Sequence, residues 1–239
     1  MRDKRRTSPV GSSRLLPALF LAAITTGCSF PTTQIETRHA SYIANSNAHA
    51  MCETPDDGIL SSVVRVATDD GADASGVIVA ADRVLTAAHV VIDADLSLVR
   101  VHGEYRKARL LAVDPGNDLA LLAVDTGSLR PVRLTHDDLF DYEQVWAVGY
   151  PLALDQVTTQ GYFRNEVEGR LFTSAPIEAG ASGGGLVRCR DGQFELAGII
   201  RGYGGYWSEG ELIPLHNLSI HTPATRIQNF VMRTDGTVL

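Results

Sequence analysis

The sequence GASGGGL at residues 180–186 places one serine, Ser182, among four glycines and directly before an apolar run. Glycine adopts backbone angles that other residues avoid, so this stretch predicts a tight turn that another group can approach closely. A serine in such a turn can present its hydroxyl beside backbone N–H groups that point the same way. Acyl transfer requires this arrangement of a nucleophile and hydrogen-bond donors. The alternative interpretation is an ordinary glycine-rich turn.

Two further stretches place a polar residue in an apolar or turn setting. The sequence VLTAAHVV at residues 84–91 contains His89, and DPGNDLALL at residues 114–122 contains Asp118. Simpler explanations exist, because His89 could be a hydrogen-bonded core histidine and Asp118 a turn cap, with Asp114 as a competing acid. The order His89, Asp118, Ser182 nevertheless predicts a serine–histidine–aspartate triad in the order found in chymotrypsin.

Each member of this triad has a distinct predicted role. Ser182 attacks the scissile carbonyl, His89 takes the serine proton and returns it to the leaving group, and Asp118 orients the imidazole. The backbone N–H groups of Gly180 and Ser182 are the predicted oxyanion hole. This chemistry needs no cofactor, and the scattered histidines lack the spacing of a zinc protease, so we expect neither a cofactor nor a metal.

Short β-like runs bounded by Gly, Asp and Pro predict an all-β sandwich or barrel. The 239 residues are 44% hydrophobic, which is enough to bury a sizeable core. One helix is expected near the end, where Thr222 is a candidate N-cap, Pro223 follows it, and Ile227 and Phe230 begin an apolar face. The expected strands are 63–67, 75–80, 83–86, 98–102, 107–114, 119–124, 145–149, 157–163, 170–173, 185–189, 196–201 and 212–215.

These motifs together resemble a trypsin-like serine protease and are most similar to its HtrA (DegP-like) branch. Four further stretches carry the resemblance: SVVRV at 62–66, SGVIV at 75–79, VGYP at 148–151 and SAPIEAGASGG at 174–184. The resemblance implies two six-stranded antiparallel β-barrels with the active site between them. The expected protease domain is residues 58–239, with barrel one at about 58–132, barrel two at about 133–221 and a C-terminal helix at 222–233. We expect no PDZ domain after it.

The chain departs from the family pattern near the serine. Ala181 stands where trypsin-type enzymes have an Asp that pairs with a new N-terminus and where HtrA members usually have Asn, so we expect no zymogen activation of that kind. Pro176 stands where trypsin has an acidic residue, which argues against a preference for Arg or Lys at the cleavage site.

The predicted substrate pocket is therefore apolar, although Arg201 beside it could instead favour an acidic group. The glycine- and aromatic-rich stretch at residues 202–207 is interpreted as a surface loop with one buried aromatic or, alternatively, as a substrate contact. The candidate pocket residues are Ile177, Ile199, Ile200 and Arg201.

The N-terminal 27 residues have the pattern of an export signal, with basic residues followed by an apolar run and small residues. The sequence TTGCS at 25–29 resembles the bacterial lipoprotein cleavage box, in which Cys28 is lipidated, and the alternative is simple secretion. Residues 28–57 are expected to be a tether.

The charge of the chain without residues 1–27 restricts its partners. This part has 16 Lys and Arg against 27 Asp and Glu, a net charge of −11. Such a surface argues against nucleic acid and anionic lipid, so we expect membrane attachment only through a lipid on Cys28. In an exported protein Cys52 and Cys189 can pair as a disulfide, and the alternative is two reduced core cysteines.

The sequence thus predicts a serine endopeptidase of the bacterial cell envelope, facing the periplasm or the exterior, that acts on polypeptide through an acyl-enzyme. Two alternatives remain open. One is a catalytically inactive protease-fold protein that binds without cleaving, and the other is an esterase that uses the same triad.

Overall fold

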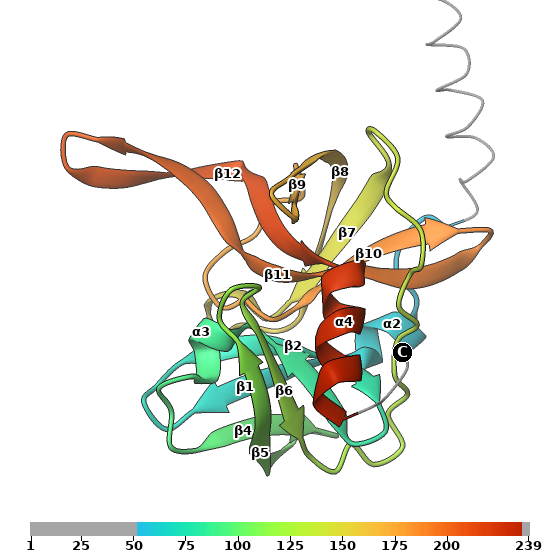
Figure 1. Ribbon diagram of the computed structural model, residues 1–239, viewed down its shortest axis with the longest axis vertical. Helices are drawn as coiled ribbons and strands as arrows, with labels where there is room; N and C mark the ends of the chain where they lie inside the picture. Colours follow the sequence, from blue (N-terminus) through green and yellow to red (C-terminus); the bar gives the residue numbers. More distant parts are fainter. Residues whose placement is uncertain (1–51, 236–239) are drawn as a thin grey trace, which may run out of the picture. The chain divides into compact units, whose positions relative to one another are not determined.

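The computed structural model describes residues 52–235, which form two closed β-barrels followed by a helix (Figure 1). The first barrel contains β1 (Val63–Thr68), β2 (Asp73–Ala80), β3 (Arg83–Thr86), β4 (Ser97–Val101), β5 (Glu104–Asp114) and β6 (Leu119–Ala123). The second contains β7 (Gln144–Gly149), β8 (Val157–Val167), β9 (Arg170–Thr173), β10 (Gly185–Arg190), β11 (Gln193–Ser208) and β12 (Glu211–Pro223).

All neighbouring strands within each barrel are antiparallel. The first barrel closes in the order β1-β2-β3-β6-β5-β4, and the second in the order β10-β11-β12-β9-β8-β7. Helix α4 (Ala224–Asp235) follows, where the sequence predicted a helix over 222–233. The predicted fold class of two six-stranded antiparallel barrels with a C-terminal helix is therefore confirmed.

Strand β2 shows why several strands of this chain are almost continuously apolar. Successive side chains of a strand point to opposite faces. Val77 packs into a cluster shared with the second barrel, whereas Ile78 packs inside the first barrel, and both are fully buried. Because both faces of β2 are covered, its sequence has no polar alternation.

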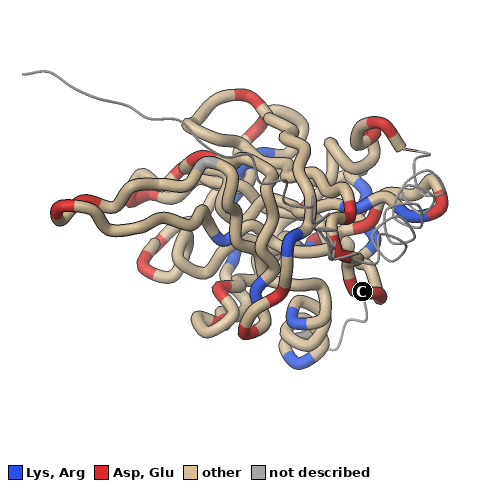
Figure 2. Tube along the Cα trace, turned by 90° about the horizontal axis from the view of Figure 1, so that it is seen from above, with Lys and Arg blue, Asp and Glu red and all other residues tan. Residues whose placement is uncertain are grey.

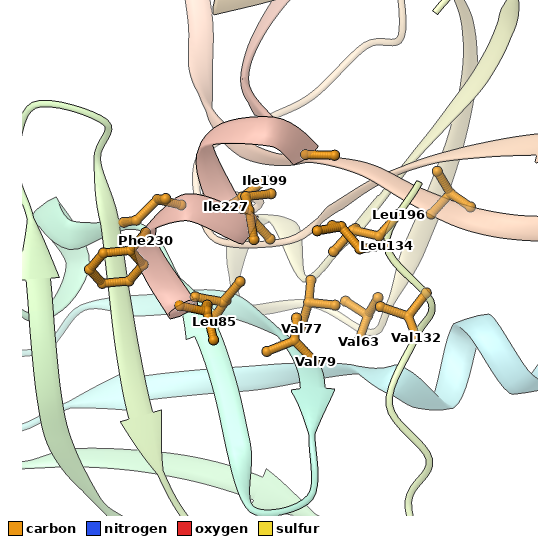
Figure 3. Close-up of a cluster of buried hydrophobic side chains, with 14 of the residues drawn as sticks. Val63, Val77, Val79, Leu85, Val132, Leu134, Leu196, Ile199, Ile227 and Phe230 are labelled. Carbon is orange, nitrogen blue, oxygen red and sulfur yellow. The ribbon is translucent and has the colours of Figure 1, made fainter. Parts of the chain in front are cut away.

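The largest buried cluster joins the two barrels and α4 (Figure 3). Val77 and Leu85 come from the first barrel, Leu196 and Ile199 from the second, and Ile227 from the helix. The apolar residues of α4 recur at helical spacing, which places them on one face against both barrels. The helix therefore belongs to the core that sets how the barrels, and the residues between them, face each other.

Strands β11 and β12 continue past the second barrel as a long hairpin, which projects away from the rest of the structure (Figure 1). The interpretation of residues 202–207 as a loop is wrong, because they belong to β11 and pair with β12. Two glycines fit this hairpin, since a Cβ on Gly204 would lie 2.5 Å from Leu218 Cδ2 and one on Gly205 would lie 2.8 Å from the carbonyl oxygen of Ile213. Cross-strand pairing has therefore overridden the low strand propensity of glycine.

Helix α2 (Asp57–Ser62) precedes the first barrel and begins at residue 57, the last residue of the stretch predicted as a tether. Asp56 caps it, with its Oδ1 accepting the N–H of Ile59 at 2.9 Å. Just before this helix, Cys52 forms a disulfide with Cys189 of β10. The predicted signal segment and Cys28 lie outside the described residues.

Candidate active site

His89 lies on α3 (Ala88–Val91), a single helical turn that follows β3. Ala88, Val90 and Val91 are buried in or beside the first barrel, and they fix this turn in place. The His89 side chain is 52% exposed, so the imidazole faces away from the barrel interior. The predicted core-histidine alternative does not describe this position, because a core histidine would be buried.

Asp118 holds one edge of this imidazole. Its carboxylate oxygens lie 2.9 and 3.0 Å from His89 Nδ1, and Oδ1 also accepts the His89 backbone N–H at 3.0 Å. A carboxylate at Nδ1 favours the tautomer with its proton on Nδ1, which leaves Nε2 free to accept a proton. The Asp118 residue is 8% exposed, so this interaction is largely shielded from water.

A compact turn before β6 places Asp118 there. Asp114 Oδ1 accepts the backbone N–H of Asn117 at 3.1 Å, and Oδ2 accepts the Asn117 side-chain amide at 2.8 Å. Burial raises the pKa of Asp114, but the hydrogen bonds from Asn117 together with the charge of Arg233 and the Gly116 backbone outweigh it, so the pKa lies below its ordinary value. Asp114, the competing acid of the sequence, thus builds the turn, and Asp118 at φ +55° ends it beside His89.

Ser182 lies in the turn before β10, and its hydroxyl has a different partner from the one expected. The Ser182 Oγ donates to the carbonyl oxygen of Arg201 at 3.2 Å. Within residues 52–235, no hydrogen bond joins this hydroxyl to His89. A rotation of the serine side chain is needed before the imidazole can take its proton, and catalytic hydrogen bonds are often long or misaligned without substrate.

The first barrel pins the serine turn through Ser75 of β2. The Ser75 N–H donates to the Ser182 carbonyl at 2.9 Å, and the Ser75 Oγ donates to the Gly180 carbonyl at 2.8 Å. The same Oγ accepts the Tyr150 N–H at 2.8 Å. Ser75 is fully buried, so these bonds are sheltered from water and fix the turn relative to β2 and α3.

The peptide between Ala179 and Gly180 is also held. Its carbonyl oxygen accepts the Leu152 N–H at 2.7 Å, and in a trans peptide the N–H points the opposite way. Among the described residues, neither the Gly180 N–H nor the Ser182 N–H has a hydrogen-bond acceptor. Gly180 has φ +92°, and a Cβ there would lie 2.7 Å from the Tyr150 carbonyl oxygen, so the turn requires glycine.

An apolar pocket of about 90 Å³ opens beside the serine turn. Ile177 and Ile200, two of the predicted pocket residues, line it together with Ala147, Val157 and Ala181. Ile199 instead packs in the large cluster between the barrels. The fourth predicted residue, Arg201, directs its side chain to Asp118, with Nε 3.8 Å from Oδ2.

Neither a metal centre nor a membrane helix is found in the described part of the chain. Residues 52–235 contain no group of three or more His, Cys, Asp and Glu side chains arranged to hold a metal ion. Among the same residues, no helix combines the length and apolar character that a membrane crossing requires.

Sequence reasoning missed two residues that support the site, Ser75 and Arg65. Ser75 stands in the quoted run SGVIV, where a hydroxyl inside an apolar strand signals a buried hydrogen-bond partner. Arg65 of β1 forms a bidentate pair with Asp73 and also donates to the Ala153 carbonyl at 2.9 Å. It thereby holds the 3-10 turn η1 (Pro151–Ala153), which carries the Leu152 N–H.

The model of the trypsin-like peptidase domain matches residues 74–199, just over half of the chain. The chain belongs to the trypsin-like peptidase family. The family match begins in β2 and ends in β11, so it contains His89, Asp118 and Ser182. The predicted resemblance to trypsin-like proteases is thus confirmed.

One curated relative and three solved structures are similar to this chain. A probable periplasmic serine endoprotease DegP-like of Pseudomonas fluorescens is 35% identical over 107 residues, which is 40% of this chain and only 21% of that protein. The serine endoprotease of Yersinia pestis is 28% identical, with a TM-score of 0.63 over 77% of this chain and 69% of that one.

The Rv3671c protease of M. tuberculosis shares the fold in two forms at 20% identity. Its active form has a TM-score of 0.65 and covers 78% of this chain and 89% of that chain. Its inactive form has a TM-score of 0.62 and covers 76% and 98%. The trypsin-like peptidase fold of this chain therefore agrees with both forms to a similar degree.

Proposed function

We propose that this trypsin-like peptidase is a serine endopeptidase that cleaves polypeptides through an acyl-enzyme on Ser182. The observation that carries the proposal is the pair of contacts between the Asp118 carboxylate and His89 Nδ1, at 2.9 and 3.0 Å. A serine turn that Ser75 pins to the same barrel supports it. This pair prepares Nε2 as a general base, and the pinned turn offers two unpaired N–H groups to a developing oxyanion.

The proposed reaction uses only groups of this chain and its substrate. The Ser182 hydroxyl turns from the Arg201 carbonyl toward His89, and its oxygen attacks the scissile carbonyl while Nε2 takes the proton. The N–H groups of Gly180 and Ser182 bind the oxyanion, and His89 then protonates the leaving amine. Water repeats the sequence to release the acyl group. The apolar pocket bounded by Ile177 and Ile200 supports a small apolar side chain at the cleavage site.

One observation favours a second function, a protease-fold protein that binds polypeptide without cleaving it. The Ser182 hydroxyl donates to Arg201 in the structure, at 3.2 Å, so the serine and imidazole are not engaged. If the hydroxyl stays there when polypeptide binds, no nucleophile forms.

Labelling by a fluorophosphonate probe, together with degradation of unfolded casein, separates the two functions. We expect the probe to label the purified domain and the domain to degrade casein. The Ser182→Ala variant should neither be labelled nor degrade casein. Ser174→Ala is the matched control, because Ser174 accepts the Tyr162 N–H at 2.9 Å and lies outside the proposed triad. Casein binding without labelling or cleavage would support the binding protein, and ester turnover without peptide cleavage would indicate an esterase.

We further propose that the protein is exported to the bacterial cell envelope and attached to a membrane by a lipid on Cys28. The export-like pattern of residues 1–27 and the TTGCS sequence support this proposal. A DegP-like relative whose name describes it as periplasmic is consistent with it. Acidic residues are spread over many segments of the described domain, so the protein surface itself offers little attraction to anionic lipid (Figure 2).

A further inference from the structure

Arg201 touches two members of the proposed triad at once. Its backbone carbonyl accepts the Ser182 hydroxyl at 3.2 Å, and its side-chain Nε lies 3.8 Å from Asp118 Oδ2. The Arg201 side chain is only 19% exposed, so the guanidinium is directed inward toward the site. Sequence reasoning placed this residue beside the substrate pocket, but the structure directs its charge to the carboxylate that orients His89.

The Asp118 carboxylate therefore contacts two groups that can carry positive charge. His89 Nδ1 is 2.9 Å from Oδ2, and the Arg201 Nε lies 3.8 Å from the same oxygen. The charged groups around Arg201 besides Asp118 are Asp114 and the guanidinium groups of Arg170 and Arg226. Because arginine stays protonated throughout the working pH range, the site contains a permanent cation close to the imidazole.

We propose that Arg201 is a positioning residue of the triad, which holds the Asp118 carboxylate against His89 and places a permanent positive charge near the imidazole. This inference rests on the proposed peptidase function. A cation near the imidazole disfavours the imidazolium ion, while the carboxylate favours it. The charge of Arg201 therefore opposes that of the Asp118 carboxylate, and its removal should be visible in the pH profile of activity.

The expected size of the effect follows from the geometry. Since both groups contact Asp118 Oδ2, at 2.9 and 3.8 Å, the imidazole and guanidinium nitrogens are at most about 7 Å apart. Loss of one of two unit charges at that distance is expected to move a pH profile by about 0.5 to 1 pH unit. Removal of the Arg201 charge is therefore expected to move the acid limb of activity upward by that amount.

The test is the pH profile of kcat/KM on labelled casein for the wild type, Arg201→Gln and Arg201→Lys. We expect the acid limb of Arg201→Gln to lie higher than that of wild type, and Arg201→Lys, which keeps the charge, to lie close to wild type. Arg226→Gln is the matched control, because it removes a neighbouring cation whose Nη1 donates to Asn117 rather than to Asp118. Its acid limb should shift much less.

A second readout does not depend on catalysis. NMR titration of the imidazole in Ser182→Ala, with and without Arg201→Gln, should show the same upward movement, and added salt should reduce the difference. If Arg201→Gln does not fold, as judged by thermal unfolding, Arg201→Met takes its place because it keeps the apolar part of the side chain.

Three outcomes would overturn the inference: an unchanged acid limb in Arg201→Gln, an equal shift in Arg226→Gln, or a rise in KM confined to substrates with acidic residues. The last result would make Arg201 a substrate-binding residue instead. A wild-type protein without hydrolytic activity would refute the proposed function, and the NMR titration would still decide the role of Arg201.

Discussion

Replacement of Ser75 by alanine is expected to lower both stability and turnover, because this buried hydroxyl serves two partners across the barrel interface. The substitution leaves the Gly180 carbonyl without its donor at 2.8 Å and the Tyr150 N–H without its acceptor at 2.8 Å. A buried polar group that loses its partner costs about 1–3 kcal/mol, so we expect the free energy of unfolding to fall by about 2–4 kcal/mol.

The effect on turnover comes from the serine turn. With the Gly180 carbonyl released, the peptide between Gly180 and Ala181 can turn, so the N–H groups of Gly180 and Ser182 on either side of it are held less firmly toward the proposed oxyanion. Loss of one oxyanion donor costs about 10²–10³-fold in kcat, and partial loss should cost less, so we expect a decrease of about 10- to 100-fold. Urea denaturation and casein hydrolysis, measured on the same preparation, give the two quantities.

Ser62→Ala is the matched control for this prediction. Ser62 is equally buried, and its hydroxyl makes a single bond, to the Ile59 carbonyl at 2.7 Å within α2. Its loss should cost about 1 kcal/mol of stability and leave kcat unchanged. If Ser75→Ala retains the kcat of Ser62→Ala, the hydroxyl does not position the serine turn, and the reasoning is refuted.

Two further predictions concern other parts of the chain. Burial lowers the pKa of His221 to about 3, so it is neutral in the folded protein while the unfolded chain binds a proton below about pH 6.5. As the pH is lowered from 6.5 to 3, the free energy of unfolding should therefore fall by up to about 1.4 kcal/mol per pH unit. The decrease should be smaller in His221→Gln, and equal pH dependence of urea denaturation in both proteins would contradict this prediction. Cys28→Ser should move the full chain from the membrane to the soluble fraction, and unchanged fractionation would exclude the lipid anchor.

The barrels were predictable because their strands leave a local signal. Runs such as 75–80 and 119–124 are short and apolar with Asp close to both ends; the first lies within β2, and the second matches β6 except for its last residue. The hairpin formed by β11 and β12 was not, since Gly204 and Gly205 interrupt its pattern and only pairing with β12 makes that stretch a strand. Strand formation there depends on a partner, which a single run of sequence does not specify.

The candidate site shows the same division between local and distant information. Residue type and order were enough to select His89, Asp118 and Ser182 as candidates. The bond between Ser75 and Gly180 joins residues 105 positions apart, and the orientation of the Ser182 hydroxyl depends on a carbonyl 19 positions away. Such contacts follow from the packing of one barrel against the other, so no local pattern in the sequence indicates them.

The cluster shared by both barrels and α4 limits how the protein can move. Any hinge motion that separated the barrels would expose Val77, Leu85, Ile199 and Ile227 to water together, and all four are fully buried. Exposure of that much apolar surface costs several kcal/mol, at roughly 25 cal/mol per Å². Changes between resting and working forms are therefore expected to be confined to loops and side-chain rotations near the proposed active site, and the two barrels are expected to unfold in one cooperative step.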